Sequence, residues 1–437
     1  MDATIGIYLL VIFGILIACG FPIAIAIACS SICIMLSVMP MKVVAITAGQ
    51  KLATGMDSFS LLAVPFFVLA GNIMNQGGIA KRLVNFAFLF VGKIPGSLSH
   101  VNVLSNMMFG SVSGSAVAAA AAVGKTLLPQ IKSTGLNLPV ASAINIASCP
   151  TGMLIPPSNG LIVYSVVSGG TSIGALFLAG YVPGILMGLG CMIVGFIYFK
   201  LKPELAGNQT RVSYTLSEKL KITWQALPSL GLIIVVIGSI IGGICTATEA
   251  ACMAVLYSLL LSWIYKAINL ETLKSISKDT IHISAMVLFL IGASTVMSYI
   301  MAYAHLPQMI SEALLSISDN KIVILLIINL TLLIVGMFMD MTPAILIFTP
   351  IFLPVTTALG IDPVHFGIII TFNLCIGIVT PPVGTALFVG CSVSNLKIEQ
   401  VIKPLLPLIF AEIAILMVVT YVPELSLYLP RLTGLLQ

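Results

Sequence analysis

Residues 148–160 combine oxygen-bearing side chains with residues that cannot continue an α-helix. This stretch reads Ser-Cys-Pro-Thr-Gly-Met-Leu-Ile-Pro-Pro-Ser-Asn-Gly and contains the pair Pro156 and Pro157. Each proline removes a backbone donor and crowds the carbonyl group one turn earlier, so a helix must break here. The freed carbonyl oxygens, with the hydroxyl groups of Ser148 and Thr151, form a set of hard, neutral donors suited to Na⁺.

Residues 373–385 repeat this arrangement later in the chain. Gly377 and Thr380 lie just before or beside a second proline pair, Pro381 and Pro382. Unwound backbone at membrane depth is tolerated only where it is buried in protein or lines a wet cavity. One such segment alone could be an ordinary proline kink, but two matching segments favour a pair of ion-binding breaks.

A third motif, Gly-Ser-Val-Ser-Gly-Ser-Ala at residues 110–116, favours the tip of a re-entrant helical hairpin. Residues 100–132 have room for two short helices that meet at this tip, and residues 335–343 are its counterpart. Half-helices whose N-termini point inward present free N–H groups and a positive dipole end, which favour anions. The same small residues could instead form a helix-packing stripe, and both interpretations can hold together.

Asp340 lies inside an apolar run, where a carboxylate is costly and by default indicates a functional site. Its residue type leaves three roles open: a ligand of Na⁺, a proton carrier, or an interfacial group at the helix end marked by Pro343. Glu249 and Glu412 are weaker candidates. Glu249 fits a capping position that opens the next span, and Glu412 fits a contact with a neighbouring helix.

Signals for enzymes and nucleic-acid binding are missing from the sequence. Neither HExxH nor GxxxxGK[ST] occurs, which argues against a zinc protease and an ATP-driven pump. The GxSxG match at residues 170–174 joins two apolar helices, whereas a hydrolase elbow needs a strand before it. Basic residues are scattered, and no CxxC or Cys/His spacing predicts a disulfide or metal cluster. The four histidines lie near expected segment ends, which favours solvated or structural roles: His100, His282, His305 and His365.

The elements that must position these motifs are membrane helices. The chain has 437 residues, of which 59% are hydrophobic and 8% charged, with a mean hydropathy of +1.16. Soluble domains carry about 25% charged residues, so this chain cannot cover a surface that faces water. Period-2 alternation is absent, which excludes a barrel and predicts an all-α polytopic membrane protein in a lipid bilayer.

Hydrophobic runs predict the order of the spans. We expect apolar segments at 5–38 (one helix kinked at Gly20–Pro22), 59–79, 83–98, 101–131 (a hairpin), 137–166, 171–200, 226–245, 247–267, 281–303, 321–337, 338–360 (a second hairpin), 363–393 and 401–429. Residues 266–279 are charged and predict a separate helix at the membrane interface. The polar loop 201–222 carries the largest group of basic residues, which places it in the cytoplasm.

The two halves of the chain carry prolines and glycines at matching positions. Pro129 and Pro354 are 225 residues apart (354 − 129 = 225). Gly135 and Gly360, Gly152 and Gly377, and Pro156 and Pro381 share this offset. Internal repeats are typical of secondary transporters, whose sites lie near the midplane where the repeats meet. We expect two related repeats with inverted orientations.

Residues 99–104, Ser-His-Val-Asn-Val-Leu, and residues 109–118, Phe-Gly-Ser-Val-Ser-Gly-Ser-Ala-Val-Ala, resemble one family. That family is the large membrane subunit of tripartite ATP-independent periplasmic (TRAP) transporters. Ile-Pro-Pro-Ser at 155–158 and Val-Thr-Pro-Pro-Val-Gly at 379–384 are similar to it as well. The resemblance covers essentially the whole chain.

This resemblance implies an elevator-type Na⁺ symporter in the bacterial inner membrane, with a mobile transport domain that holds both hairpins and both discontinuous helices. It implies a small four-helix membrane partner and a periplasmic binding protein that delivers an organic acid. One Na⁺ site would use Ser111, Ser113, Gly114, Ser148 and Thr151, and a second would use Gly336, Asp340, Thr342, Gly377 and Thr380. The substrate would lie between the hairpin tips near Ser115, Asn159, Pro156 and Pro381.

The implied domains follow the same division. We expect N-terminal scaffold helices at 1–98, a first transport unit at 99–166, scaffold and arm helices at 167–320, a second transport unit at 321–393 and a C-terminal helix at 394–437. No small-subunit segment precedes the first span, so we expect that partner to be a separate polypeptide.

One departure bears on the substrate. Many members of the family have an acidic residue soon after the Ser-Gly-Ser-Ala-Val core, where this chain has only alanines 118–122. This resembles the sialic-acid branch more than the C4-dicarboxylate branch. A stand-alone ion-coupled carrier that needs no binding protein is a second hypothesis. An intramembrane enzyme is a third, disfavoured because the sequence lacks paired membrane acids and a Ser/His pair.

Overall fold

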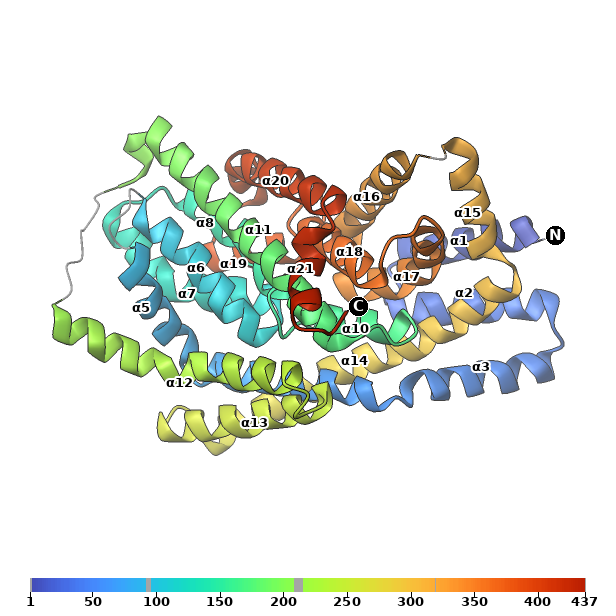
Figure 1. Ribbon diagram of the computed structural model, residues 1–437, viewed down its shortest axis with the longest axis horizontal. Helices are drawn as coiled ribbons and strands as arrows, with labels where there is room; N and C mark the ends of the chain where they lie inside the picture. Colours follow the sequence, from blue (N-terminus) through green and yellow to red (C-terminus); the bar gives the residue numbers. More distant parts are fainter. Residues whose placement is uncertain (1, 92–95, 208–214, 319, 437) are drawn as a thin grey trace.

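The computed structural model describes residues 2–91, 96–207, 215–318 and 320–436, and within these ranges the regular elements are all helices (Figure 1). Eight of the described helices are long and apolar enough to cross a membrane. The pair formed by residues 138–154 and 159–167, which is bent by 47°, would make a ninth span. The all-α polytopic class predicted from composition is confirmed.

In the first half, the described residues form eleven α-helices and one 3-10 turn. In chain order they are α1 (Asp2–Ala18), α2 (Ile23–Val38), α3 (Met41–Met56), η1 (Phe59–Leu62), α4 (Ala63–Gln76), α5 (Ile79–Val91), α6 (Ser97–Ser113), α7 (Ala116–Thr134), α8 (Leu138–Ser148), α9 (Thr151–Leu154), α10 (Asn159–Val167) and α11 (Ile173–Leu201). A second 3-10 turn, η2 (Pro203–Leu205), follows α11.

Ten α-helices are formed by the part of the second half that the structure describes. They are α12 (Leu216–Ile241), α13 (Ala247–Ile264), α14 (Leu270–Tyr303), α15 (Leu306–Ile317), α16 (Lys321–Phe338), α17 (Met341–Ala358), α18 (Pro363–Gly377), α19 (Thr385–Ser394), α20 (Ile398–Tyr421) and α21 (Glu424–Leu432).

Helices of the two halves begin at a nearly constant offset. α7 begins at Ala116 and α17 at Met341 (341 − 116 = 225), and the starts of α8 and α18 and of α11 and α20 differ by the same amount. Contacts between the halves are reciprocal: α7 packs on α19 as α17 packs on α10, and α8 packs on α20 as α18 packs on α11. Reciprocal contacts between equivalent elements are the pattern of a two-fold relation. The inverted orientation of the repeats stays a prediction.

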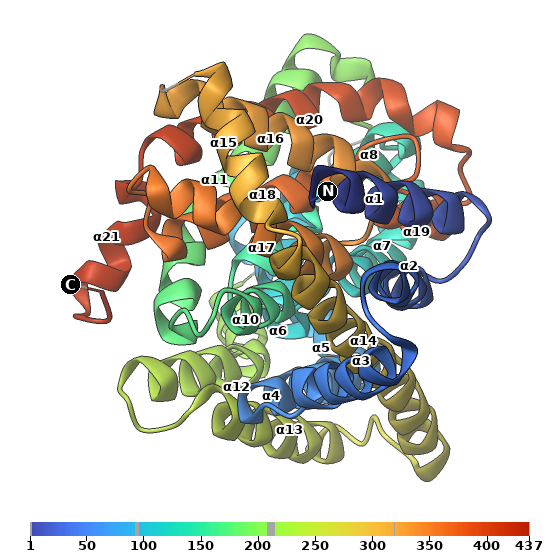
Figure 2. The ribbon, with the colours of Figure 1, turned by 90° about the vertical axis from the view of Figure 1, so that its right-hand side faces the viewer.

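Long helices form one side of the molecule. In Figure 1, α3, α14, α12 and α13 run along the lower edge, and the helices of both hairpins and both breaks lie above them. α14 packs against α2, α3 and α4, and α13 packs against α4 and α12. Figure 2, from the side, shows α3, α4, α12 and α13 below α10, α17 and α18. The candidate site residues therefore lie in the helices of the hairpins and breaks, above α3, α12, α13 and α14 in this view.

Turn residues explain why the first hairpin forms. α6 ends at Ser113, and the next residue, Gly114, has a φ of 61° in the left-handed region that favours glycine. Ser115 then opens α7, and its side chain accepts a hydrogen bond from the backbone N–H of Ala118 at 3.3 Å. α7 contains Pro129 and ends at Thr134, and the following Gly135 also has a positive φ. The predicted hairpin at 101–131 is confirmed, with arms slightly longer than expected.

Two predicted helices have the wrong extent. Residues 5–38 do not form one kinked helix, because Gly20, with φ of 81°, and Pro22 end α1 before α2 begins. α1 and α2 pack on one another instead. Conversely, residues 266–279 do not form a separate interfacial helix, since α14 runs unbroken from Leu270 to Tyr303. A change in polarity at Asp279 does not interrupt the backbone.

The second hairpin also differs from its prediction. Its arms are α16 and α17, so the expected span at 321–337 is the first arm and the tip is Met339–Asp340. Pro350 and Pro354 lie inside α17 without ending it. The expected span at 401–429 divides into α20 and α21. Helices α3 and α15 lie outside all the predicted spans.

The cytoplasmic loop predicted at 201–222 is shorter than expected. α12 begins at Leu216, where Thr215 and Glu218 form a capping box. Residues 208–214 of this loop, and residues 92–95 of the expected span 83–98, lie outside the described residues.

Candidate functional site

The first hairpin touches the first break through two glycines. A Cβ atom placed on Gly152 would lie 2.1 Å from the Cα of Gly110, and one placed on Gly110 would lie 2.7 Å from the Cα of Gly152. The two backbones are therefore in direct contact, which no other residue type would permit. This contact holds the last turn of α6, with Ser111, Ser113 and Gly114, against α9.

A buried amide cluster lies beside the end of α8. The Nδ2 of Asn106 lies within hydrogen-bond distance of four oxygens: Asn102 Oδ1 (3.1 Å), Asn145 O (3.3 Å), Asn145 Oδ1 (3.0 Å) and Ser148 Oγ (2.8 Å). Asn145 in turn donates to the carbonyl of Ala120 on α7 at 3.0 Å. The amide donors of Asn106 and Asn145 therefore link α6, α7 and α8, while Asn106 Oδ1 is buried without a hydrogen-bond partner among the described residues.

The hydroxyl groups predicted for the first Na⁺ site all bond to the backbone. Ser111 donates to Met108 O (2.9 Å), and Thr151 donates to Ser148 O (2.6 Å). Ser113 lies 3.4 Å from Ser115 O, and Ser148 donates to Ile144 O at 2.7 Å. A hydroxyl that donates to the backbone keeps lone pairs for a cation. Ser148 stands apart from the others, because its oxygen accepts from Asn106.

The second hairpin meets the second break in the same way. A Cβ atom on Gly377 would lie 2.4 Å from the Cα of Gly336. Thr385, at the start of α19, donates to Asp340 Oδ1 at 3.3 Å. Asp340 as a whole residue is exposed. The tip of hairpin 2 thus holds a carboxylate, a hydroxyl and unwound backbone in one place.

Two further residues predicted for the second site lie on its borders. Thr380 donates to Ile376 O at 2.7 Å, and Thr342 is in the first turn of α17, two residues after Asp340. Buried amides support this half as well, since Asn373 Nδ2 donates to Asn329 Oδ1 at 2.7 Å. Asn329 in turn donates to Thr420 Oγ1 at 3.1 Å.

The residues predicted to contact substrate differ in burial. Pro156 is buried, Ser115 and Asn159 are partly exposed, and Pro381 is partly exposed at the second break. A Cβ atom on Gly114 would lie 3.5 Å from Asn159 Nδ2, so Asn159 lies beside the tip of hairpin 1. Ser115 and Asn159 are thereby brought together, whereas Pro156 is packed away from solvent.

The two candidate sites meet near the centre of the molecule. A Cβ atom on Gly160 would lie 2.3 Å from the Sδ atom of Met341, so the start of α10 touches the start of α17. Cys375 Sγ lies 3.7 Å from Pro150 O, and these residues are themselves 225 apart (375 − 150 = 225). Equivalent positions that touch one another lie at the two-fold axis of a repeat.

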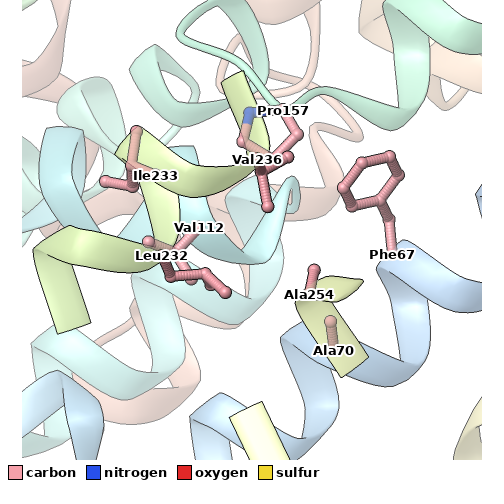
Figure 3. Close-up of a pocket in the computed structure, with 8 residues that line it drawn as sticks. All are labelled: Phe67, Ala70, Val112, Pro157, Leu232, Ile233, Val236 and Ala254. Carbon is pink, nitrogen blue, oxygen red and sulfur yellow. The ribbon is translucent and has the colours of Figure 1, made fainter. Parts of the chain in front are cut away.

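An apolar cavity lies between the first break and the long helices (Figure 3). It is lined by Val112 of hairpin 1, Pro157 of the break, Phe67 and Ala70 of α4, Leu232, Ile233 and Val236 of α12, and Ala254 of α13. The side chains that the first break and these helices present to the cavity are therefore apolar.

The remaining acidic residues have structural surroundings. Glu249 forms a capping box with Thr246 at the start of α13, as the sequence predicted. Glu412 is fully buried on α20, and Cys191 of α11 donates to its Oε1 at 3.3 Å. The predicted contact of Glu412 with a neighbouring helix is therefore confirmed. His365 is buried and contacts Ser426 and Thr420, which fits a structural role.

Sequence reasoning missed Thr385 and the amides of Asn106, Asn145, Asn329 and Asn373. Asparagine in an apolar helix was a usable signal, because an amide in a membrane helix needs a partner from another helix. Within the described residues, no group of three or more His, Cys, Asp and Glu side chains could hold a metal ion. The available oxygens are neutral hydroxyls and carbonyls, with Asp340 as the one charge at the tips.

Comparison with known proteins agrees with this architecture. Residues 10–425 match the family described as "Tripartite ATP-independent periplasmic transporter, DctM component". The chain is 53% identical to the uncharacterized protein YgiK of Salmonella typhimurium, over 96% of each chain. It is 40% identical to the sialic acid TRAP transporter large permease protein SiaM of Vibrio cholerae, over 88% of this chain and 89% of that one.

A further relative and a solved structure are also similar to this chain. The chain is 36% identical to the C4-dicarboxylate TRAP transporter large permease protein DctM of Rhodobacter capsulatus, over 98% and 99% of the two chains. Its fold is similar to that of the YdaH transporter of Alcanivorax borkumensis, with a TM-score of 0.62, 15% identity and coverage of 84% and 86%. The chain therefore belongs to the DctM-component family of tripartite ATP-independent periplasmic transporters, as a multi-pass protein of the bacterial inner membrane that transports organic acids and is not an enzyme.

Proposed function

We propose that this chain is the membrane permease for Na⁺-coupled uptake of an organic acid. The observation that carries the proposal is the paired contact of hairpin tip and break, Gly110 on Gly152 and Gly336 on Gly377. Each contact places hydroxyl and carbonyl oxygens beside unwound backbone. Such oxygen sets at the midplane suit a coupling ion.

In this proposal each half holds one Na⁺. The first ion is bound by oxygens of Ser111, Ser113, Gly114, Ser148 and Thr151. The second is bound by oxygens of Gly336, Asp340, Thr342, Gly377 and Thr380. The contact between Thr385 and Asp340 supports the second set, because it holds the carboxylate beside the break.

The proposed substrate lies between the tips of the two hairpins, within reach of Ser115 and Asn159 and beside Pro156 and Pro381. The contact of Gly160 with Met341 supports this location, because it brings the two sites together. A sialic acid is the preferred substrate and a C4-dicarboxylate the alternative. The similarity to SiaM and the alanines at 118–122 favour the former.

Transport proceeds in this proposal by an elevator movement. The units at 99–166 and 321–393 move together, and the helices of 1–98 and 167–320 provide the scaffold and arms. The cavity between Pro157 and helices α4, α12 and α13 supports such a division, since the residues that line it are apolar.

Two partners complete the proposed transporter, a small four-helix membrane subunit and a periplasmic binding protein. The test is uptake of labelled N-acetylneuraminate or succinate into proteoliposomes that contain this chain. We expect uptake only with an inward Na⁺ gradient, the small subunit and loaded binding protein. Uptake that tracks a proton gradient without Na⁺ would overturn the coupling, and uptake by this chain alone would favour a stand-alone carrier.

A further inference from the structure

Glu412 is an acidic residue inside the apolar helix α20, and the proposed function does not use it. Its side chain is fully buried, and Cys191 of α11 donates to its Oε1 at 3.3 Å. Its other oxygen, Oε2, is buried without a hydrogen-bond partner among the described residues. An ionisable group inside the membrane part of a protein is costly and by default indicates a functional site.

Among the described residues, no cation is paired with this carboxyl group. The ion pair that they form joins Arg431 to Glu424. The groups that act electrostatically with Glu412 are three thiols on neighbouring elements, those of Cys149, Cys191 and Cys375. An ionised carboxylate offers about four acceptor positions, and a thiol is only a weak donor. A buried charge with so little compensation is strongly unfavourable, whereas the neutral acid avoids most of this cost.

Charged side chains on the helices packed against α20 lie away from Glu412. These helices are α8, α11, α18 and α19, and α8 contains no charged residue. Lys200 is in the last turn of α11, and His365 of α18 bonds to the backbone of α20 at Thr420, about 12 Å along the helix from Glu412. Cys391 of α19 interacts with the acidic residue in the first turn of α20 instead. Thiols are therefore the titratable groups that face Glu412.

The other half of the chain has an apolar residue at the equivalent place. Met187 of α11 is separated from Glu412 by the repeat offset (412 − 187 = 225) and is also fully buried. α11 packs on α18 as α20 packs on α8, so the two side chains lie on equivalent helices. Replacement of a buried charged group by an apolar one of similar size is often neutral or stabilising. Packing alone therefore does not require an acid at this position.

The helices around Glu412 belong to different units of the proposed transporter. α8 is in the first transport unit, α11 is among the scaffold and arm helices, and α20 is in the C-terminal segment. The contact of α11 with α20 is close, since a Cβ atom on Gly190 would lie 2.3 Å from Ile415 Cδ1. Water therefore reaches the carboxyl group of Glu412 only when these helices separate.

We propose that Glu412 is a proton-binding site, which holds a proton in this conformation and releases it when α20 separates from α8 and α11. In the release step the O–H bond of the carboxyl group breaks, its electron pair stays on the carboxylate, and water accepts the proton. Before the helices pack again, the carboxylate must take up a proton from water. The release rests on the movement in the proposed function, whereas the bound proton does not.

Infrared spectroscopy of the purified full chain tests whether the proton is bound, because a carboxylic acid and a carboxylate absorb in different regions. The variant is Glu412→Gln, a neutral side chain of the same size, and the control is Glu399→Gln, which changes an exposed acid on the same helix. At neutral pH, the wild type minus Glu412→Gln spectrum should contain a carboxylic acid band that shifts in D₂O. The wild type minus Glu399→Gln spectrum should contain carboxylate bands instead.

Carboxylate bands in the difference spectrum of Glu412→Gln would overturn the proposal. Thermal unfolding midpoints show whether each variant is folded. Glu412→Met, which copies the equivalent Met187, provides the same difference spectrum if Gln disturbs the packing of α20.

Na⁺-driven uptake at equal pH on both sides of the membrane tests the release. Between about pH 6 and 8, the uptake rate of Glu412→Gln relative to the wild type should rise by up to about tenfold for each pH unit, because the protonated fraction of a carboxyl group in water falls in this proportion above its ordinary range. The same ratio for Glu399→Gln should stay constant. A constant ratio for Glu412→Gln would overturn the release step.

The two measurements separate this inference from the proposed function. If the wild type takes up no acid with a Na⁺ gradient, the proposed function and the release step both fail. The infrared difference spectrum needs no transport, so it still decides whether Glu412 binds a proton.

Discussion

The two breaks are built alike but lie in different surroundings. Residues 155–158 of the first break are buried, and Pro157 packs against the cavity formed with α4 and α12. At the second break, Pro382 and Val383 are exposed, and 41% of the surface of Val383 is accessible. Equivalent pieces of one repeat are therefore unequally exposed at the surface of the chain. A transporter needs this inequality, because a site open on both sides at once would leak.

The largest expected effect is on chemical labelling of equivalent positions. Ser158 and Val383 are separated by the repeat offset (383 − 158 = 225), and Ser158 is fully buried. In a background in which the nine native cysteines are replaced, Val383→Cys should react with a maleimide at least about tenfold faster than Ser158→Cys, since a buried thiol reacts only when the structure opens. The measurement is the time course of labelling in membranes.

Na⁺ and substrate sharpen this comparison. An alternating mechanism predicts that labelling of Ser158→Cys accelerates, and that of Val383→Cys slows, when conditions favour the opposite state. Equal rates for both positions under all conditions would show that the difference in exposure does not exist in the membrane.

The next largest effect concerns the glycine contacts. Gly152→Ala and Gly377→Ala each insert a methyl group where another backbone lies within 2.5 Å, at 2.1 Å and 2.4 Å respectively. Overpacking of this kind costs about 1–3 kcal/mol. Both variants should lower the thermal unfolding midpoint and weaken Na⁺-dependent stabilisation. Gly238→Ala in α12 is the control, because no atom lies within 4 Å of its added Cβ.

Removal of the charge at the second tip tests the asymmetry between the halves. Asp340→Asn should weaken the apparent affinity for Na⁺ by roughly 10- to 100-fold, because a hydrogen-bonded charged group contributes about 1.5–3 kcal/mol. Thr385→Val and Thr380→Ala should act in the same direction with smaller effects. Glu424→Gln, which disrupts the exposed pair with Arg431, is the control and should leave Na⁺ dependence unchanged. A normal Na⁺ response in Asp340→Asn would exclude Asp340 as a ligand.

The smallest effect compares the amide clusters. Asn106→Leu removes the donor at the centre of four oxygens, and Asn373→Leu removes a donor with two acceptors. Loss of a buried hydrogen-bonding partner costs about 1–3 kcal/mol, and we expect the greater loss of thermal stability for Asn106→Leu. Ser133→Ala, on an exposed hydroxyl, serves as the control. A greater loss for Asn373→Leu would reverse the ranking of the two clusters.

The sequence predicted features that depend on local backbone chemistry. Proline pairs and glycines revealed both breaks and the first tip, because these residues restrict or release the backbone wherever they occur. It failed where a polarity change was taken as a helix boundary, as at Asp279 inside α14, and where an apolar run concealed a turn, as at Gly20. Hydropathy indicates whether a segment lies in lipid or in water, but it does not show where the backbone turns and a helix ends.

Side-chain partners were the least predictable part of the site. Thr385 lies 45 residues from Asp340, and Asn145 reaches Asn106 across 39 residues. Such pairs depend on how α6, α8, α16 and α19 pack in three dimensions. The repeat offset supplied positions that correspond, such as Ser115 and Asp340, but it did not predict which neighbour each would contact.

The glycine contacts have a mechanical consequence. Where two backbones touch without intervening side chains, there are no rotamers to absorb a relative displacement, so tip and break behave as a single stiff joint. Relative movement must therefore occur at other boundaries, such as the cavity lined by the apolar side chains of Phe67 and Val236. A force that moves the tip of a hairpin therefore moves the adjoining break with it.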